Sequence, residues 1–600
     1  MWQADYLARE QKNFNWNLQI LLGIIIAFFS VLGFRLFFLQ IIRRQALLAI
    51  SEQNRTQLYV EQANRGFIYD RKGEILADIQ PSFLVTFSNL KIDEDKLAAE
   101  IKELSRLLRV PSRELREKIN ALKGYPFEAL PLVKNISRDT LLKLIEEIPN
   151  LPGINIQVVP QRRYPKGETA CHILGYIGEI SKEELKKNVS LGDEYRPGDW
   201  IGKTGLEKIY DNLLRGEDGG SQVEVDAHGR QQRIIQRIEP VPGDNLILTL
   251  DYSLQKLAEE SLRGKSGAVV ALDPRNGEVL ALASAPAFNP NIFIQKGNRV
   301  ELERIFNDLD HPMMNRAIQG TYPPGSIFKP ITALAGLEKG IDPTRKIFCP
   351  GFFLLGQEDR KFRCWNEKGH RRVGLIEAMA FSCDVYFYHL GLIVGSDLLE
   401  DWAKSFGLGS ITGIDLPAEK PGLVAGKAWK KKNHRVGWYH GDTVNMAIGQ
   451  GFFLLTPLQA AMIAGCVANG GKVYRPYLLK KVLGQNDRVV KEFYPRLIRN
   501  IEVEMKNLRL VQQGMAVVVA SGTGQNGAVA GINVAGKTGT AQNPHGEDHA
   551  WFIAYAPVEY PQIAVSVIVE NGGHGGAVAA PIAAKIIEEY LRAQNAKRKT

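Results

Sequence analysis

The sequence of 600 residues is long enough for two or more domains, and its hydrophobic fraction of 45% and charged fraction of 23% are those of an ordinary globular protein. The formal net charge is +10 and the pI is about 9.1. This basic balance suits a protein that works near an anionic lipid surface or an acidic polymer. We expect no nucleic-acid partner, because no clustered basic motif with interleaved aromatic residues stands out.

A hydrophobic segment lies near the N-terminus. Residues 18–34 contain no charge, and the apolar character resumes after Arg35 as far as residue 42, before Arg43 and Arg44. The segment is long enough to span a bilayer if Arg35 reaches the interface. No small-residue cleavage site follows it, so we predict a short cytoplasmic tail at residues 1–17 and one uncleaved transmembrane helix at residues 18–42. The alternative, a buried core helix, fits its position and all-round apolarity less well.

Residues 43–240 are expected to form an elongated pedestal domain that resembles a dimerisation domain. Residues 65–73 and the apolar run after them predict a strand, a turn and a second strand. Residues 91–122 and 138–148 have helical spacing with charged outer faces, and the pair Thr204-Gly205 is interpreted as the start of a helix over residues 206–214. Nothing here indicates catalysis, so we interpret the region as a spacer or interaction module.

A domain boundary is predicted near residues 240–244, and residues 241–592 are expected to form a second domain, followed by a basic tail at 593–600. Strands are predicted at residues 246–250, 551–556 and 563–569, helices at 252–262 and 579–591, and a hairpin at 267–272 and 278–283. The expected fold class is a multidomain α+β or α/β protein, in which this domain is an antiparallel sheet flanked by helices.

The sequence Ser326-Ile-Phe-Lys329 places a hydroxyl and an amine three residues apart, on one face if the segment is helical. Pro330 indicates that the helix begins close to Ser326, where free N–H groups favour developing negative charge. A serine hydroxyl is a weak nucleophile, and a neutral lysine beside it can take its proton. A chance Ser-x-x-Lys is common in a chain of this length, so the motif needs further support.

Two further motifs supply other parts of an acyl-transfer site. In Ser382-Cys383-Asp384, the hydroxyl of Ser382 can relay a proton to a leaving amine. In Lys537-Thr538-Gly539-Thr540, on a predicted strand, the lysine offers a positive charge to a substrate carboxylate and the threonine a hydroxyl. Gly539 lets a peptide approach the strand closely, and the backbone N–H groups of Ser326 and Thr540 can form an oxyanion hole. No partner is evident for Glu207 or Glu570.

These three motifs resemble those of penicillin-binding proteins and serine β-lactamases. Further stretches extend the resemblance over nearly the whole chain and favour class B penicillin-binding proteins: residues 65–71, 202–207, 447–451, 456–459 and 549–557. The Ser-x-Asp form of the second motif and the cysteines around it are similar to the elongation-type members. Asp384 departs from the asparagine that is common elsewhere in the family, and a carboxylate cannot donate a hydrogen bond as an amide can.

The resemblance implies a serine-type D,D-transpeptidase that cross-links peptidoglycan stem peptides during cell elongation. It would form an acyl-enzyme on Ser326 with a stem that ends in D-Ala-D-Ala, and β-lactams would acylate the same serine. It also implies a single-pass protein of the cytoplasmic (inner) membrane with its bulk outside the cytoplasm, and a polytopic elongation glycosyltransferase as partner. The alternative function is a penicillin-binding sensor or scaffold without turnover.

The sequence holds five cysteines, of which three lie between the first motif and the end of the second. A tetrahedral zinc site is one interpretation of this group, and the resemblance strengthens it because elongation-type members carry a metal here. The metal would hold the second motif from behind. A disulfide or buried free thiols are the alternatives. The candidate ligands are Cys349, Cys364, His370 and Cys383, while Cys171 and Cys466 are predicted to be core residues.

Overall fold

The structure is a computed structural model, and it falls into two compact units. The first comprises Met1–Gln62, Pro81–Val159 and Asp218–Val241, and the second comprises Ala63–Gln80, Pro160–Glu217 and Pro242–Thr600. The structure describes residues 2–45, 47, 56–88, 94–121, 129–151, 154–190, 195, 198–225, 231–295, 298–356, 360–543 and 546–599. Helices and sheets are mixed in both units, as the sequence predicts.

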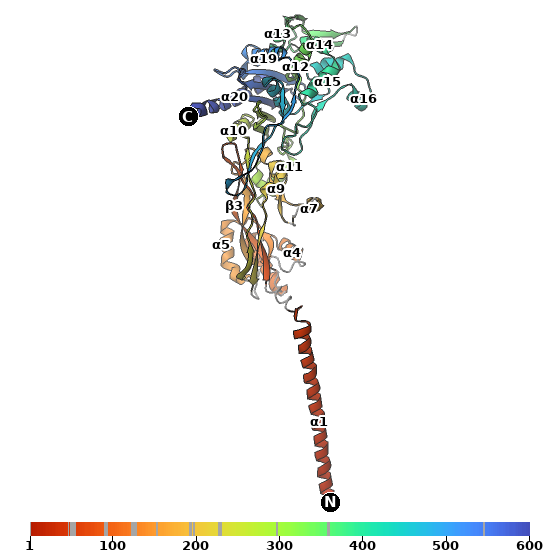
Figure 1. Cartoon of the computed structure of the whole chain (residues 1–600), viewed down its shortest axis with the longest axis vertical. Helices are drawn as coiled ribbons and strands as arrows, with labels where there is room; N and C mark the ends of the chain where they lie inside the picture. The colour runs from red at the N-terminus through yellow and green to blue at the C-terminus, as the bar shows by residue number, and fades with distance from the viewer. Residues whose placement is uncertain are drawn as a thin grey trace. The chain divides into compact units, whose positions relative to one another are not determined.

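The chain begins with a long helix, α1 (Trp2–Phe37), which a short π-helical turn, η1 (Phe38–Ile42), continues (Figure 1). The segment from Asn15 to Ile42 has a mean hydropathy of 2.5, and none of it is buried. In the described part of the chain this is the one helix that is long and apolar enough to cross a membrane. It contains the predicted span at residues 18–42 and is consistent with a single-pass membrane anchor.

The first unit combines two sets of strands with a small helical core. Strands β1 (Thr56–Glu61), β8 (Gly219–Val225) and β9 (Gln231–Ile238) form one antiparallel sheet. The C-terminal half of β3 (Ile75–Ser88) pairs with β4 (Ala129–Val133), and β5 (Ile154–Arg163) also pairs with β3. Apolar side chains of α3 (Glu94–Leu108), α4 (Ser112–Ala121) and α5 (Arg138–Glu147) pack against these strands. A short turn, η2 (Ile148–Asn150), follows α5.

Two predicted helices differ from the structure at identifiable residues. The segment predicted as one helix at 91–122 is broken between α3 and α4, where Arg109 has a φ of +53° and Pro111 precludes helical continuation; residues 91–93 and 122 lie outside the described residues. The helix predicted at 206–214 is two short helices, α8 (Gly205–Ile209) and α9 (Asp211–Leu214), which meet at Tyr210. The prediction at 138–148 is confirmed by α5.

In the second unit, a buried ion cluster forms around Glu207 of α8. This carboxylate accepts hydrogen bonds from Arg65 Nε at 2.7 Å, Arg162 Nε at 2.6 Å and Tyr164 OH at 3.1 Å. Arg65 also donates to Asp211 at 2.6 Å, so both arginines have a carboxylate partner. The side chains of Glu207 and Arg162 are fully buried. The cluster therefore joins three segments that lie far apart in the sequence, and it supplies the partner of Glu207 that the sequence did not reveal.

The central sheet of the second unit has five antiparallel strands in the order β12-β11-β25-β24-β23. Alternate residues point to opposite faces: Val269 and Ala271 join one core cluster, whereas Ala268 and Val270 join the other. Helices α10 and α20 pack on the first face, and α18 packs on the second. The bounds are β11 (Gly267–Leu272), β12 (Val279–Ala285), β23 (Ala535–Ala541), β24 (His549–Ala556), β25 (Ile563–Val569), α10 (Tyr252–Ser261), α18 (Pro457–Ala468) and α20 (Gly575–Lys599).

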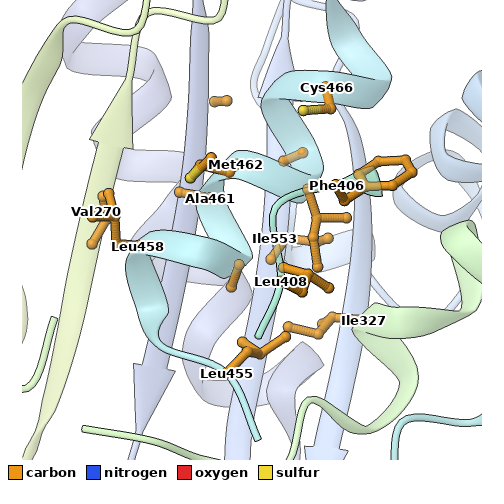
Figure 2. Packing of buried hydrophobic residues seen from close by; sticks show 14 of the residues in the cluster. Val270, Ile327, Phe406, Leu408, Leu455, Leu458, Ala461, Met462, Cys466 and Ile553 are labelled. Atoms are coloured by element: carbon orange, nitrogen blue, oxygen red, sulfur yellow. The ribbon is translucent and has the colours of Figure 1, made fainter. Parts of the chain in front are cut away.

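Figure 2 shows the second face of the sheet. Leu458 and Met462 of α18 lie near Val270 of β11, and Ile553 of β24 lies with Leu408 and Ile327 on the other side of the helix. Ile327 is the residue after Ser326, so the predicted nucleophile is attached to this core. The predicted hairpin and the pairing of the two C-terminal strands are confirmed, and the C-terminal helix is longer than the predicted 579–591.

The remaining elements of the second unit surround this layer. Among them are β2 (Ile68–Tyr69), α6 (Cys171–Leu174), β6 (Ile177–Glu179), α7 (Lys182–Ser190), β7 (Trp200–Gly202), β10 (Asn245–Leu248) and β20–β21 (Leu479–Leu483, Val489–Glu492). The helices beyond the hairpin are α11 (Arg299–Asn307), α12 (Lys329–Glu338), α13 (Leu375–Ala380), α14 (Asp384–Val394), α15 (Ser396–Ser405), α16 (Lys427–His434), α17 (His440–Ala447) and α19 (Met505–Ala520). Short strand pairs are β13–β16 (Ile347–Cys349, Arg371–Val373), β14–β15 (Phe352–Leu355, Arg360–Arg363), β17–β18 (Leu423–Val424, Phe453–Leu454) and β19–β22 (Lys472–Tyr474, Leu497–Asn500).

The ion cluster generates a stability prediction. Replacing Glu207→Gln keeps the side-chain shape but leaves the buried Arg162 guanidinium without a carboxylate, so we expect a loss of about 3 kcal/mol in the free energy of urea unfolding at pH 7. Glu303→Gln is the control, because its pair with Arg299 is exposed and should change stability by less than about 0.5 kcal/mol. Equal effects of the two substitutions would contradict a structural role for the cluster.

The same comparison has a defined pH dependence. Burial acts to raise the pKa of Glu207, but Arg162 and Arg65 outweigh it and hold that pKa below the ordinary 4.5. A carboxyl group whose pKa is lowered by folding stabilises the folded state. This stabilisation is fully present when the pH is above the pKa of the unfolded chain, and it is lost as the pH falls through the lower pKa of the folded state. The difference between the wild type and Glu207→Gln should therefore be largest at neutral pH and shrink below about pH 4.5.

Candidate active site

Ser326 lies in a short 3₁₀ turn, η4 (Gly325–Phe328), directly before α12 (Lys329–Glu338). The prediction that the helix begins close to Ser326 is confirmed, because the 3₁₀ turn runs directly into α12. Pro330 stands in the first turn of α12, where no N–H is needed. Ser326 is half-buried, and its Oγ forms no hydrogen bond with any residue that the structure describes. The hydroxyl is free to meet a substrate.

The backbone around Gly325 brings the serine against strand β23. Gly325 has a φ of +55°, and a Cβ at this position would lie 2.6 Å from the carbonyl oxygen of Thr540. Its N–H donates to the carbonyl oxygen of Gly449 at 2.9 Å. Only glycine tolerates both the left-handed conformation and the close approach, so this residue fixes the distance between the serine turn and β23.

Lys329 is fully buried, and its ammonium group connects the first motif to the second. Nζ donates to Ser382 Oγ at 3.1 Å, to the Ser382 carbonyl oxygen at 2.9 Å and to Asp384 Oδ1 at 2.7 Å. Ser382 precedes α14 with a φ of +54°, a conformation that turns both its hydroxyl and its carbonyl oxygen toward the lysine. The structure therefore brings together the first and second motifs, which are more than fifty residues apart in the sequence.

Lys537 approaches the same hydroxyl from β23. Its Nζ donates to Ser382 Oγ at 2.9 Å and to the Thr538 carbonyl oxygen at 3.0 Å, and the side chain is fully buried. Burial lowers the pKa of Lys537 well below its usual range, the charge of Lys329 lowers it further, and Asp384 acts in the opposite direction. In the protein without substrate this shift works against the predicted role of Lys537 as a fixed positive charge.

Both oxygens of Asp384 accept hydrogen bonds. Oδ1 accepts from Lys329, and Oδ2 accepts from the backbone N–H of Trp365 at 2.9 Å. An asparagine here would turn its NH₂ group toward one of these donors and lose that hydrogen bond. The two donors thus give a physical reason why this chain has an aspartate where asparagine is common.

The remaining residues of the third motif line up along β23, the edge strand of the five-stranded sheet. Thr538 Oγ1 shares a hydrogen bond of 2.6 Å with Thr523 Oγ1. A Cβ on Gly539 would lie 2.9 Å from both Ile327 Cγ2 and Trp551 Cβ, so packing against the serine turn requires glycine here. Thr540 is half-buried at the end of the motif, and no described strand pairs with the outer edge of β23, which leaves that edge available to an extended peptide.

The sequence did not reveal the contacts that hold the turn before Ser326. Glu570, at the end of β25, accepts hydrogen bonds from Tyr322 OH at 2.6 Å and from Arg316 Nε at 2.9 Å. Trp551 Nε1 donates to the Pro323 carbonyl oxygen at 3.1 Å. These residues belong to no short motif, and their roles depend on strand register, so only the structure identifies them.

The four predicted metal ligands lie together beside the second motif. The candidate ligand atoms of Cys349, Cys364, His370 and Cys383 all lie within 4.8 Å of one another, and the three cysteines are buried. His370 Nδ1 lies 3.7 Å from Cys349 Sγ and 3.5 Å from Cys364 Sγ. Two of the cysteines directly precede residues of the active site, because Cys383 precedes Asp384 and Cys364 precedes Trp365.

The thiols shift one another's pKa values through their contacts. A hydrogen bond with Cys383 lowers the pKa of Cys364, whereas the same hydrogen bond, and then burial, raise the pKa of Cys383. Burial also raises the pKa of Cys349. Four soft ligands converging on one point are the donor set that zinc prefers. All five cysteines are free in the structure, and Cys171 and Cys466 are buried as core residues, as predicted.

The contacts of Asp384 generate the second prediction. In Asp384→Asn the buried Lys329 ammonium loses its carboxylate, so we expect unfolding stability at pH 7 to fall by about 3 kcal/mol or more. The Lys537 pKa, already below the ordinary 10.5, should fall further. Because the buried Lys537 then favours its neutral form more strongly, the stability deficit should shrink as the pH rises toward 10.5. A deficit that is independent of pH would contradict the electrostatic explanation.

Comparison with known proteins places this site in a family. Residues 267–588 match the penicillin binding protein transpeptidase domain, and residues 60–248 match the penicillin-binding protein dimerisation domain. A relative named peptidoglycan D,D-transpeptidase MrdA, from Acinetobacter baumannii, is 36% identical over 98% of this chain and 89% of its own length.

Solved structures agree with this match. The complex between penicillin-binding protein PBP2 and MreC from Helicobacter pylori has a TM-score of 0.78 and 30% identity, and covers 90% of this chain and 99% of that one. A structure described as the structural coordination of polymerization and crosslinking by a peptidoglycan synthase complex has a TM-score of 0.70 and 30% identity, with coverage of 95% and 97%. With matches over both domains and relatives along almost its whole length, the chain belongs to the penicillin-binding proteins, with a dimerisation domain followed by a transpeptidase domain.

Proposed function

We propose that the protein is a serine-type D,D-transpeptidase that cross-links peptidoglycan stem peptides through an acyl-enzyme on Ser326. The observation that carries the proposal is the meeting of Lys329 and Lys537 at the hydroxyl of Ser382, beside a serine hydroxyl that is free to react. This arrangement supplies a nucleophile, two buried amines and a proton relay within one transpeptidase domain. The names of the relatives agree with this activity.

The hydrogen bonds through Ser382 explain how a neutral base is formed. Lys537, whose pKa is lowered, accepts the hydroxyl proton of Ser382, while Ser382 takes a proton from Lys329. Lys329 becomes a neutral amine and Lys537 becomes an ammonium. The substrate carboxylate favours this exchange when it binds near Lys537 and Thr538, so the predicted positive charge of Lys537 arises with the substrate.

The reaction then proceeds in two balanced steps. Ser326 Oγ attacks the carbonyl carbon of the penultimate D-Ala and its proton passes to Lys329. The peptide bond breaks as Ser382 delivers a proton to the leaving amine of the terminal D-Ala and takes the proton of Lys329 in its place. The acceptor amine next attacks the ester carbonyl and gives a proton to the neutral Lys329, a new peptide bond forms, and the ester C–O bond breaks as Lys329 returns that proton to Ser326 Oγ. The backbone N–H groups of Ser326 and Thr540 are proposed to bind the developing oxyanion.

The cellular setting is part of the same proposal. The resemblance to elongation-type members supports a role in cell elongation, and the apolar helix α1 supports a single-pass anchor in the cytoplasmic (inner) membrane. The bulk of the chain is placed outside the cytoplasm because of the proposed reaction, the cross-linking of peptidoglycan. The solved complex of a related PBP2 with MreC supports elongation-machinery proteins as partners. A polytopic glycosyltransferase is proposed as a further partner, in keeping with the related synthase complex.

A penicillin-binding sensor or scaffold without turnover is the alternative. Its expected site would lack one of the chemical groups that acyl transfer needs. Here Lys329, Ser382, Lys537 and Thr538 are joined by hydrogen bonds, and Ser326 lies in the turn directly before Lys329. The complete cluster favours the enzyme.

The labelling of the protein by a fluorescent penicillin tests the proposal. We expect one label per chain with a long lifetime, because a transpeptidase is acylated but has no group placed for fast hydrolysis of the ester. Ser326→Ala should label at background. Separately, purified wild-type protein should cross-link un-cross-linked glycan strands that carry pentapeptide stems, while Ser326→Ala should not. Long-lived labelling of the wild type without any cross-linking would favour the sensor.

We also propose that Cys349, Cys364, His370 and Cys383 bind one structural zinc ion. Three thiolates and one imidazole form a closed tetrahedral set, and the proximity of the four ligand atoms supports it. His370 Nδ1 faces the thiols, at 3.7 Å from Cys349 Sγ and 3.5 Å from Cys364 Sγ, so this nitrogen is the one placed to bind the ion. The ion would fix Cys383 and Cys364, and through them the adjacent Asp384 and Trp365.

Metal analysis tests the zinc proposal. We expect about one zinc ion per chain in protein purified without chelator, with no loss of thiols, and a loss of most of this zinc in Cys364→Ser. Cys466→Ser is the matched control, because this buried cysteine lies outside the ligand group. Two lost thiols and no bound zinc would instead favour a disulfide.

A further inference from the structure

Helix α16 (Lys427–His434) and the residue after it form a basic surface that the reaction steps above do not use. The segment 427–435 contains five lysines and arginines and no acidic residue. Lys427 pairs with Asp397, and the buried Lys430 pairs with Asp442. Lys431, Lys432 and Arg435 are exposed and form no ion pair with any residue in the described ranges. The helix dipole favours cations at this end, but it does not explain Arg435 beyond the helix or the absence of acidic partners.

Aromatic rings form a platform beside these charges. The ring centroids of Trp429, His434 and Phe452 lie 4.8–5.4 Å from one another. The Lys430 ammonium lies 4.6 Å from the Tyr439 ring and 5.7 Å from the Phe452 ring, and its pairing with Asp442 holds these side chains in place. The platform is therefore preformed, which reduces the entropy that is lost when a ligand binds.

The platform continues into the active site. Two residues before Phe452, Gln450 Nε2 donates to the Thr540 carbonyl oxygen at 3.4 Å, and the neighbouring Gly449 accepts the N–H of Gly325. A pocket of about 120 Å³, lined by Trp438, Asn445, Gln450 and Phe452 among others, adjoins the platform at Phe452 and extends to Gln450. A polymer bound at the platform and in this pocket would therefore lie next to Gln450, which contacts Thr540 of the third motif.

We infer that this platform, formed by Trp429, Lys431, Lys432, His434, Arg435 and Phe452, binds the second peptidoglycan strand, the one that supplies the acceptor amine. The inference rests on the proposed function and names the binding surface for its second substrate. Peptidoglycan combines sugar rings, whose apolar faces pack on aromatic side chains, with stem peptides that carry carboxylates. The unpaired lysines and arginine complement those carboxylates, while the donor strand is held at β23 on the other side of the serine turn.

The test uses the full-length protein in detergent and un-cross-linked glycan strands that carry pentapeptide stems. Lys431→Glu/Lys432→Glu/Arg435→Glu reverses the free charges, and Trp429→Ala removes part of the aromatic platform. The matched control Lys182→Glu/Lys186→Glu/Lys585→Glu reverses three exposed lysines on α7 and α20. The rate of penicillin labelling, which needs no second strand, serves as the readout of the active site and of folding in each variant.

We expect the charge-reversal variant to bind the strands about tenfold more weakly at low salt, and its KM for cross-linking to rise while kcat and penicillin labelling stay near the wild-type values. Added salt should weaken the wild type more than this variant. The inference would be overturned if the charge-reversal variant bound the strands as well as the wild type, or if the control variant lost as much affinity. It would also be overturned if the variant lost affinity for vesicles of anionic lipid but not for the glycan strands. A wild-type protein that is not labelled by penicillin would instead contradict the proposed function on which the inference rests.

Discussion

The hydroxyl of Ser382 accepts hydrogen bonds from two buried lysines, and the rest of the site depends on this contact. Lys329 and Lys537 reach it from a helix and from a sheet edge at 3.1 and 2.9 Å. Two ammonium groups in one buried site repel each other and have lost their hydration, which costs free energy. One amine must therefore be neutral, or a carboxylate must pair with one of the charges. The lowered pKa of Lys537 and the contact between Lys329 and Asp384 show that the protein does both.

The surrounding fold holds the two lysines and Ser382 in position. The five-stranded sheet carries Lys537 on its edge strand, and Gly325 and Gly539 let the serine turn pack directly against that strand. Glu570 secures the segment before the serine through Tyr322 and Arg316. On the opposite side, the group of cysteines borders Asp384 and Trp365. Each of these contacts restrains the position of a reacting group without touching the substrate, which is how preorganised sites achieve their rate.

Several elements of the fold and the three motifs of the site could be predicted from the sequence, because each depends on a local pattern of residues. The apolar segment, the hairpin at 267–285 and the C-terminal strands follow from periodicity, and the three motifs carry their chemistry in adjacent residues. The sequence also indicates that a helix begins close to Ser326, but it does not show that the first turn is 3₁₀, because 3₁₀ and α-helical turns share the same residue preferences. The helix predicted at 206–214 is broken at Tyr210, for which the sequence offers no glycine or proline as a signal.

The long-range partners were not predictable. Glu207 meets arginines 142 and 45 positions away, and Glu570 meets Tyr322 across 248 positions, so only the fold brings them together. The basic run at 427–435 and its Trp429 are visible in the sequence, but Tyr439 and Phe452 lie outside the run, so the sequence does not show that these rings and charges lie together. Only tertiary packing combines these residues into one surface.

Mass spectrometry of the penicillin-treated protein is the most direct test of the account, because it identifies the atom that becomes reactive. After proteolysis, the account predicts a single drug adduct on the peptide that contains Ser326, and fragmentation should place it on the serine side chain. An adduct on any other residue, or no adduct after complete reaction, would contradict the assignment of Ser326 as the nucleophile.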